Sequence, residues 1–371
     1  MSPDRSRRIA EALPCEISMS PRSRQPPADT VFVSVVLPVF NEERHIEACL
    51  QTVLEQDYPP DRYEVIVADG GSTDRTREIV TAIAGQDSRV RLIDNPGRMQ
   101  AAGLNLAIRA SRGDVIARQD GHAEWAPDHL SRSVALLLST GADNVGGRQE
   151  AIGDGAPGRA IARAMRSPFG VGGARFRYSE HEEEMPTVFL GTFRRGAFER
   201  VGLFDEAYPP HEDYELNERI RTTGGRILFS PDIRTRYHVR SGFRALARQY
   251  YRYGRGKVRV ARASPGVMRP YHLVAPALVA GLPVMAAMAA TGRGRRLALA
   301  GAGTYAAACV IAGQQAGRGD PVSVRGRIPI AFAVMHLAWG TGFWAGVLEA
   351  ARAVDTGGGS PPRLPVRSKT A

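Results

Sequence analysis

The 371-residue chain lacks the features of a disulfide-stapled or metal-stapled protein. Its three cysteines, Cys15, Cys49 and Cys309, are far apart and form no CxxC pair, so we expect neither a disulfide framework nor a zinc site. This cysteine usage fits a reducing, cytosol-facing compartment best. The N-terminus holds arginines and prolines without an apolar segment, so we expect no secretory signal there. No GxxxxGK loop occurs either, which argues against a P-loop nucleotide-binding protein.

Acidic residues are absent from a long stretch in the second half of the chain. After Asp232 the next acid is Asp320, and the whole chain has 49 lysines and arginines against 38 aspartates and glutamates, a net charge of +11. Basic residues crowd the first part of this stretch: Arg240, Arg244, Arg248, Arg252, Arg255, Lys257, Arg259, Arg262 and Arg269. Because apolar sequence follows at once, this basic belt indicates contact with an anionic membrane surface rather than with nucleic acid. A solvated charged face is the alternative.

Three uncharged stretches follow the basic belt, at residues 273–292, 297–317 and 328–348. Each has the length, about 20 residues, that a helix needs to span a bilayer. Their high content of alanine and glycine weakens the insertion signal, so a buried or interfacial helical hairpin is the alternative. The loops between the stretches are equally basic, and the orientation in a membrane is therefore not encoded clearly.

Strand-like and helix-like patterns alternate in the N-terminal part of the chain. Strands are predicted at residues 31–39, 63–68, 89–95 and 114–120, with helices after the first three. This alternation predicts an α/β fold with a mostly parallel, doubly wound sheet. Ligands of such sheets bind where strands end in loops, which here read PVFNEE, ADGGSTD, DNPGR and QDGHA.

Two residues in these loops are candidates for binding a nucleotide. Asp69 ends the second predicted strand, where its carboxylate could accept hydrogen bonds from a ribose or a base. An Asx-turn that starts the loop GGST is the alternative role for this residue. Arg98 follows Asn95-Pro96-Gly97, and its planar guanidinium suits phosphate oxygens, although a lone loop arginine is more often solvated.

The segment Asp120-Gly121-His122 is either a turn or a place where a metal ion and a phosphate meet. In extended geometry, side chains two residues apart point to the same side, which would bring Asp120 and His122 together. Mg²⁺ is commonly bound through one or two protein oxygens while substrate phosphates fill the other positions. Imidazole suits Mn²⁺ or later metals better, so His122 would bind such a metal or touch the phosphate itself.

A helix is predicted from about His211 to Thr223. Its first-turn acids stabilise the helix N-terminus in one interpretation, and supply Asp213 as a general base in the other. Three more candidates stand in the basic belt, where the aromatic residue could also line an interface: Gln249, Arg252 and Tyr253. Residues 151–190 combine glycines with acids, and we expect them to be irregular.

Taken together, these motifs resemble the family 2 glycosyltransferases, most closely the membrane-attached enzymes of the succinoglycan biosynthesis type. The similarity runs from about Val33 to about Pro276. It is carried by LPVFNEE, EVIVADGGSTD, DNPGRMQAAGLNLAI, RQDGHAEW, SPFGVGGARFR, GTFRRGAFERVGLFDE, HEDYELNERIR and QYYRYGRGK. The resemblance implies a GT-A, Rossmann-like fold and an inverting transfer from a nucleotide-diphosphate sugar, commonly a UDP-sugar.

The resemblance also implies roles for single residues. Those that match the nucleoside pocket are Pro38, Phe40, Glu42 and Asp69. Arg98 matches a position near the diphosphate, Asp120 the first aspartate of the DxD metal motif, and Asp213 the catalytic base. Gln249, Arg252 and Tyr253 resemble the QxxRW motif that packs near the donor, with tyrosine in place of tryptophan. The sequence departs from the family pattern at two places. DGH replaces DxD, so the role of His122 as the second metal ligand and the choice between Mg²⁺ and Mn²⁺ stay open. Asp69-Gly70 replaces the common DD, which leaves one carboxylate for the nucleoside.

The implied reaction moves a hexose, with glucose expected, to a lipid-linked sugar during exopolysaccharide or cell-surface glycan synthesis. A divalent ion on Asp120 would neutralise the departing nucleoside diphosphate while Asp213 deprotonates the acceptor hydroxyl, and Glu212 would orient the acceptor or keep Asp213 basic. The apolar C-terminus predicts a polyprenyl-diphosphate-linked acceptor and an inner-membrane location with the catalytic domain facing the cytoplasm. We expect no nucleic acid partner.

We expect the following regions: a disordered arm (1–30), a GT-A domain (31–240), a basic amphipathic juxtamembrane segment (241–272), about three transmembrane or membrane-associated helices (273–351) and a disordered tail (352–371). A processive polysaccharide synthase is an alternative function, favoured by QYYRY but opposed by the small number of apolar stretches. A nucleotide-sugar-binding protein without transfer activity is another, opposed by the presence of both Asp120 and Asp213. A nucleotidyltransferase could also place an aspartate at a strand end.

Overall fold

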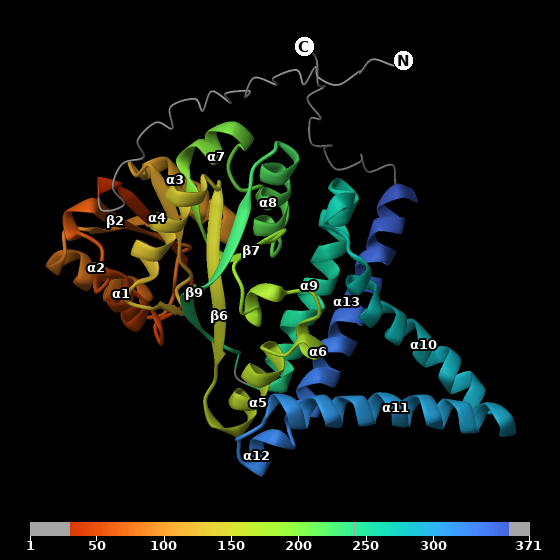
Figure 1. Ribbon diagram of the computed structural model, residues 1–371. Coiled ribbons are helices and arrows are strands. Elements are labelled where there is room, and N and C mark those ends of the chain that lie inside the picture. Colours follow the sequence, from red (N-terminus) through yellow and green to blue (C-terminus); the bar gives the residue numbers. More distant parts are fainter. Residues whose placement is uncertain (1–29, 241, 356–371) are drawn as a thin grey trace, which may run out of the picture.

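The computed structural model describes residues 30–240 and 242–355. Residues 1–29 of the predicted arm and 356–371 of the predicted tail lie outside the described residues. Figure 1 shows a sheet flanked by helices, with long C-terminal helices extending from it. Within the described residues the sheet has nine strands in the order β3-β2-β1-β4-β8-β6-β9-β5, and β7 pairs with β9.

The N-terminal half of the sheet is parallel, as predicted. Its elements are β1 (Val33–Val39), α1 (Ile46–Leu54), β2 (Tyr63–Asp69), α2 (Thr76–Gln86), β3 (Val90–Asp94), α3 (Gln100–Ala110) and β4 (Val115–Arg118). Every residue of β1 and β2 is buried, so both strands are covered on both faces. Val39 pairs with Asp69, and Asp69 with Asp94, so these three strands end at one edge of the sheet.

The remaining strands make the sheet mixed. β8 (Phe189–Arg194) is antiparallel to both β4 and β6 (Asn144–Ile152), whereas β6 is parallel to β9 (Ile227–His238). The short strands β5 (Ala123–Trp125) and β7 (Glu183–Glu184) run antiparallel to β9. The predicted α/β fold is therefore confirmed, with the parallel pairing concentrated in the strands that the sequence pattern identified.

Residues 151–190 are more regular than predicted. They include α5 (Gly155–Met165) and α6 (Pro168–Val171), and α5 buries Ile161 and Met165 against α13 (Ile328–Asp355). The expectation of an irregular stretch was wrong for α5. Its apolar face is short, and the partner that covers it comes from much later in the chain.

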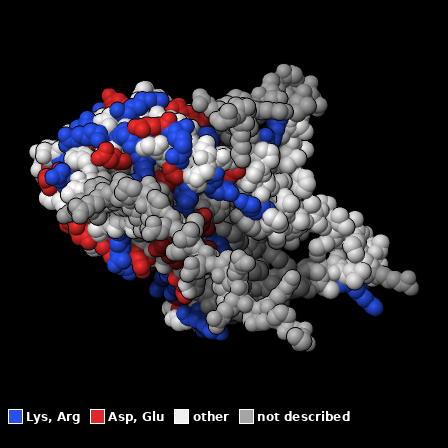
Figure 2. Space-filling view, turned by 45° about the horizontal axis from the view of Figure 1, so that its top comes forward, with Lys and Arg blue, Asp and Glu red and all other residues white. Residues whose placement is uncertain are grey.

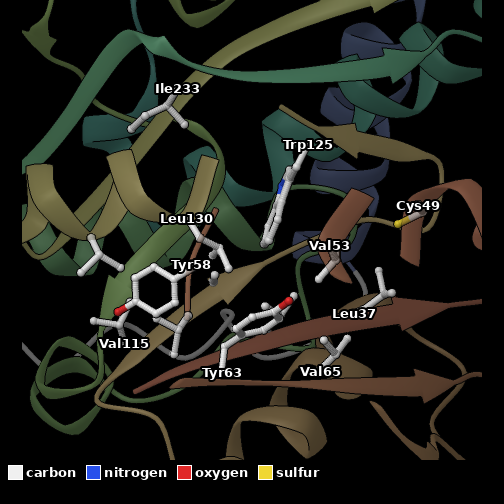
Figure 3. Close-up of a cluster of buried hydrophobic side chains, with 14 of the residues drawn as sticks. Leu37, Cys49, Val53, Tyr58, Tyr63, Val65, Val115, Trp125, Leu130 and Ile233 are labelled. Atoms are coloured by element: carbon white, nitrogen blue, oxygen red, sulfur yellow. The ribbon is translucent and has the colours of Figure 1, made fainter. Parts of the chain in front are cut away.

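Two apolar clusters fill the two faces of the sheet. Figure 3 shows the first, in which Tyr58, Tyr63, Trp125 and Leu130 lie among aliphatic side chains of the strands. Leu130 belongs to α4 (His129–Thr140), which covers this face. The second cluster packs against α3 and two later helices, α7 (Arg195–Val201) and α8 (Glu212–Thr222). These helices bring the predicted catalytic segment onto the sheet.

The C-terminal helices are α9 (Phe243–Ala263), α10 (Val274–Ala289), α11 (Gly292–Ala316), the short α12 (Val322–Arg325) and α13. α13 lies alongside α9, while α10 and α11 extend away from the sheet (Figure 1). A Cβ at Gly254 of α9 would lie 2.1 Å from the Trp339 carbonyl oxygen of α13, so only glycine permits this approach. The stretches Pro270–Ala289, Gly294–Ala316 and Val322–Arg352 are long and apolar enough to cross a membrane.

Charge is distributed unevenly over these parts. Figure 2 shows acidic and basic side chains crowded on the surface of the sheet domain, whereas the protruding helices show mostly uncharged side chains. The arginines of α9 form one exposed stripe at helical spacing: Arg244, Arg248, Arg252, Arg255, Arg259 and Arg262. Lys257 differs from them, because its side chain is only 1% exposed. The structure therefore separates this lysine from the predicted basic belt.

Candidate active site

Asp69 at the end of β2 is held by its own loop. Its carboxylate accepts hydrogen bonds from the Ser72 backbone N–H and, at 2.6 Å, from the Ser72 hydroxyl, and it pairs with Arg77 at 3.2 Å. This is the Asx-type arrangement that was one of the two predicted roles. The loop is further tied to the end of β1, because Asn41 Oδ1 accepts a hydrogen bond from the Thr73 N–H at 2.8 Å. The nucleoside contact of Asp69 stays a prediction.

The loops after β1, β2 and β3 converge as predicted. A Cβ placed on Gly70 would lie 3.6 Å from both Arg98 Cα and Phe40 Cβ, so these residues share one small surface. Phe40 is half exposed there, as a side chain that stacks on a base needs to be. Arg98 has a positive φ of 54° and lies beside Gly71. Pro38 differs from them, since it is buried against Gly103 of α3.

The segment Asp120-Gly121-His122 is a turn between β4 and β5. The Ala123 N–H donates to the Asp120 carbonyl oxygen at 3.0 Å, so the expected extended geometry was wrong. The strand ends at Arg118, two residues before the aspartate. The side chains of Asp120 and His122 nevertheless line the same cavity, and the metal site stays a prediction.

A buried arginine connects Asp120 to the start of α8. Arg118 Nε lies 3.3 Å from Asp120 Oδ1, and Arg118 Nη2 lies 3.5 Å from Glu212 Oε1. All three side chains are at most 12% exposed, so their charges interact with little screening by water. This bridge places Asp213, the next residue of α8, on the cavity that Asp120 also lines. Asp120 and Asp213 therefore line one cavity, whereas Asp69 does not line it.

Burial governs the acidity of the two α8 carboxyl groups. Burial raises the pKa of Glu212 to about 7, with Arg118 opposing the shift and Asp213 adding to it. Burial also raises the pKa of Asp213, again opposed by Arg118. The start of α8 is anchored by His211, whose Nε2–H donates to the Tyr253 carbonyl oxygen at 2.8 Å. Burial lowers the pKa of His211 to about 4, so this imidazole is neutral at neutral pH.

A cavity of about 870 Å³ contains these groups. Six of the predicted site residues line it: Asp120, His122, Asp213, Gln249, Arg252 and Tyr253. The other five lie at the neighbouring strand ends and do not line it: Pro38, Phe40, Glu42, Asp69 and Arg98. The two sets are linked by His122, whose Nδ1 lies 2.9 Å from Glu42 Oε1. The site therefore consists of an open surface at the ends of β1–β3 and a deep cavity beyond β4.

The residues that resemble the QxxRW motif lie on α9 at the wall of the cavity. Gln249 Nε2 donates to the Tyr253 hydroxyl at 3.0 Å and to the Tyr237 hydroxyl at 3.2 Å. Its Oε1 is buried and has no hydrogen-bond partner among the described residues. Arg252 is exposed and makes no ion pair with a described residue. Both side chains are therefore available to a ligand.

Comparison with known proteins decides the family. Residues 34–202 match the domain described as Glycosyl transferase family 2. The chain is also 34% identical over 331 residues to the succinoglycan biosynthesis protein ExoA of Rhizobium meliloti. This alignment covers 86% of the chain and 96% of the relative. The chain belongs to glycosyltransferase family 2. The resemblance seen in the sequence motifs is thereby confirmed, and the protein is a glycosyltransferase.

Two further comparisons extend this result. The glycosyltransferase is 27% identical over 234 residues to a dolichyl N-acetyl-alpha-D-glucosaminyl phosphate 3-beta-D-2,3-diacetamido-2,3-dideoxy-beta-D-glucuronosyltransferase of Methanococcus voltae, covering 61% of this chain and 73% of that one. A solved structure, the mannosyltransferase PcManGT from Pyrobaculum calidifontis in complex with GDP-Man and Mn²⁺, superposes with a TM-score of 0.59 at 23% identity, covering 85% and 88% of the two chains. This similarity supports the GT-A fold.

The donor atoms in the cavity of this glycosyltransferase fit a divalent ion. Asp120 Oδ1 accepts hydrogen bonds from Gln100 and Arg118, and no described residue donates to Oδ2. With its Nδ1–H directed to Glu42, His122 keeps Nε2 free, which is the arrangement typical of metal-binding histidines. No cluster of three or more metal-binding side chains occurs in the described part of the chain. Substrate oxygens and water would therefore have to complete the coordination.

The sequence patterns missed several residues of the site. Arg118 lies inside a predicted strand and Gln100 starts a predicted helix, so neither stands in a recognisable loop motif. Lys257 was counted with the exposed basic belt. A signal for Lys257 was present in its spacing, since it lies seven and eight residues after the buried Tyr250 and Gln249 on the same helix face.

Proposed function

We propose that this glycosyltransferase transfers a hexose, with glucose expected, from a UDP-sugar to a lipid-linked sugar with inversion at the anomeric carbon. The single observation that carries this proposal is the course of the cavity. Its lining includes Asp120 and Asp213 together with Val274, Leu278 and Met335 of the apolar helices. A lipid-linked acceptor would therefore reach the catalytic carboxylates without leaving the apolar helices.

Asp213 is proposed to act as the general base. Its carboxylate lines the cavity, and its Oδ1 is oriented by the Tyr214 backbone N–H at 2.8 Å. A base placed here takes the proton of the acceptor hydroxyl as that oxygen attacks the sugar, and a positioned base contributes roughly 10²- to 10⁴-fold in rate. Glu212 is engaged by Arg118 and is nearly fully buried, so it supports the position of α8 instead of meeting the acceptor.

Asp120 and His122 would hold a divalent ion, Mg²⁺ or Mn²⁺. When bound, such an ion stabilises the negative charge of a departing nucleoside diphosphate. Arg118 holds the Asp120 carboxylate in place, and Gln100 orients the same oxygen at 3.0 Å. Glu42 fixes the His122 ring through Nδ1. The nucleoside is proposed to lie on Phe40 and Asp69, with its diphosphate directed past Arg98 toward Asp120.

The acceptor is proposed to be a polyprenyl-diphosphate-linked sugar. The relative from Methanococcus voltae is named for a lipid-phosphate-linked acceptor, which supports a lipid carrier here as well. The exposed arginine stripe of α9 would face the anionic headgroups, and the apolar helices would lie in the bilayer. Together these features support an inner-membrane enzyme of exopolysaccharide or cell-surface glycan synthesis, with its catalytic domain on the cytoplasmic side.

A screen of nucleotide sugars tests this proposal. Full-length protein in nanodiscs would be incubated with UDP-, GDP- and dTDP-linked hexoses, with or without a prenyl-diphosphate-linked sugar, in Mg²⁺, Mn²⁺ or chelator. We expect UDP release that depends on both the ion and the lipid-linked acceptor. Addition of a single sugar would separate the enzyme from a processive synthase. Tight donor binding without product in any combination would reject transfer activity.

The pH dependence of turnover follows from the raised pKa values. The base must be deprotonated, so kcat/KM is expected to rise with pH through the raised pKa of Asp213, above the usual value of 3.8. Glu212 has its pKa raised to about 7 by burial and partly by the charge of Asp213, so it is still protonated while Asp213 ionises. The Glu212→Gln variant should therefore keep the acid limb in place and lose any second inflection near pH 7. The measurement is kcat/KM from pH 4.5 to 9. An acid limb that moves to lower pH in the variant would show that Glu212 is already ionised when Asp213 titrates.

A further inference from the structure

Lys257 is a buried cation without a hydrogen-bond partner. Its side chain is 1% exposed, and Nζ finds no acceptor among the described residues. Nζ makes a cation–π contact with the face of the Tyr214 ring, whose centroid lies 3.7 Å from it. Buried ammonium groups are normally hydrogen bonded, so this one calls for a ligand that the protein itself does not provide. Lys257 lines the cavity and is therefore accessible to such a ligand.

Arg177 is a second cation of the same cavity with unused donors. It ends the short 3-10 helix Arg175–Arg177, and its Nε and Nη1 atoms are buried without hydrogen-bond partners among the described residues. Its guanidinium lies near Phe176, at 5.5 Å from the ring centroid. Each of these two free N–H donors can donate a hydrogen bond to a phosphate oxygen. The cavity thus has two sets of unused cationic donors.

The acids of the cavity do not neutralise these two cations. Three carboxylates line it, and Asp120 and Glu212 are both engaged by Arg118. Asp213 attracts Lys257 at longer range but makes no ion pair with it. Within the described residues, the wall around Lys257 and Arg177 therefore carries an excess of positive charge.

The two cations share one cavity with Asp213 and with residues of the apolar helices. Tyr214, which contacts Lys257, directly follows Asp213. The Tyr271 ring lines the same cavity and packs against Gly173, where a Cβ would come within 2.2 Å, and Tyr271 precedes α10 in the chain. The lining then becomes apolar at Val274 and Leu278. An acceptor sugar placed at Asp213 would have its lipid end, and hence its phosphates, on this side.

We propose that Lys257 and Arg177 form a subsite for the diphosphate that joins the acceptor sugar to its lipid. This inference rests on the proposed lipid-linked acceptor and identifies the residues that recognise it. The donor diphosphate has its own expected residues at the strand ends, Arg98 and Asp120. Two diphosphates on opposite sides of Asp213 would keep the acceptor hydroxyl directed at the donor sugar, and an acceptor without phosphate would bind poorly.

Binding of prenyl probes tests the subsite independently of turnover. Full-length protein in phosphatidylcholine nanodiscs would be titrated with farnesyl diphosphate, farnesol, inorganic pyrophosphate and UDP with Mn²⁺, with affinity measured by calorimetry. We expect farnesyl diphosphate to bind at least about tenfold more tightly than farnesol or pyrophosphate. Lys257→Met and Arg177→Met should each weaken farnesyl diphosphate about tenfold or more, and leave UDP affinity within about twofold.

Arg109→Met is the matched control, because it removes one charge from an exposed position of α3 that does not line the cavity and should leave all affinities unchanged. Thermal melting verifies that each variant is folded. Unchanged farnesyl diphosphate affinity in the folded variants would remove the two cations from this role. An equal loss of UDP affinity would assign them to the donor, and tight binding of free pyrophosphate would reject a lipid-linked ligand. None of these results depends on the nucleotide-sugar screen, so the subsite can fail while the transfer activity stands.

Discussion

The Asp213→Asn variant is expected to lose turnover by about 10²- to 10⁴-fold while it still binds the donor. Asparagine has the same shape, and its side-chain oxygen can keep the hydrogen bond from the Tyr214 N–H, so α8 should start as before. It cannot accept the proton of the acceptor hydroxyl. Single-turnover rates with donor and lipid-linked acceptor, together with UDP affinity, measure the effect.

Glu218→Gln is a suitable control on the same helix. Glu218 pairs with Arg221 and does not line the large cavity, so this variant should keep nearly full activity. A drop in both variants would indicate a disturbed α8 and not a lost base. If Asp213→Asn turns over within about threefold of the unmodified enzyme, the base lies elsewhere, and the neighbouring Glu212 becomes the first residue to examine.

The second large effect is expected for Asp120→Asn. This change keeps an oxygen for the hydrogen bonds from Gln100 and Arg118 but removes the negative charge that would bind the ion. The increase in UDP affinity on adding Mn²⁺ should disappear, and turnover should fall by roughly 10²-fold or more, because an ion at the leaving group is worth several kcal/mol. Calorimetry of UDP with Mn²⁺ or with chelator measures the first effect directly.

Asp143→Asn provides the comparison for Asp120→Asn. Asp143 also forms an ion pair, with Arg200 at 2.7 Å, but it directly precedes β6 and does not line the cavity. In the Asp143→Asn variant, the increase in UDP affinity on adding Mn²⁺ should equal that of the unmodified enzyme. A persistent Mn²⁺ effect in Asp120→Asn would mean that the ion is held by other groups. His122→Ala would then show whether the imidazole is one of them.

The sequence allowed a good part of the active-site edge to be predicted. Short apolar runs alternating with helices identify parallel strands whose ends meet, and Asp69 and Arg98 were expected at those ends for this reason. Phe40 was expected there through the family resemblance. The expected extended geometry of Asp120 and His122 was wrong, because the strand ends two residues earlier and a turn follows. Asp120 and His122 nevertheless line one cavity, because a tight turn can also direct two side chains to the same side.

Other site features depend on contacts that no local pattern encodes. Arg118 is the last residue of the buried strand β4, and nothing in the local sequence distinguishes it from other strand residues. Its link between Asp120 and α8 is seen only in the structure, where Glu212 Oε1 lies 3.5 Å from Arg118 Nη2. Lys257 looks like one more member of a basic belt until α9 packs against Tyr214 and α13. The α5 helix was missed for a similar reason, since its covering partner is distant in the chain.

The sequence by itself determined the order of the first four strands and the helices between them, the family and the apolar stretches at the C-terminus, because each of these depends on residues close together along the chain. Only the tertiary structure decided that the cavity lined by Asp120 and Asp213 is also lined by those apolar helices, and that two cations face it without hydrogen-bond partners among the described residues. The physical reason is that burial and charge pairing are properties of neighbours in space. A cationic side chain is solvated on one face of α9, as the arginines are, and desolvated on the other, as Lys257 is.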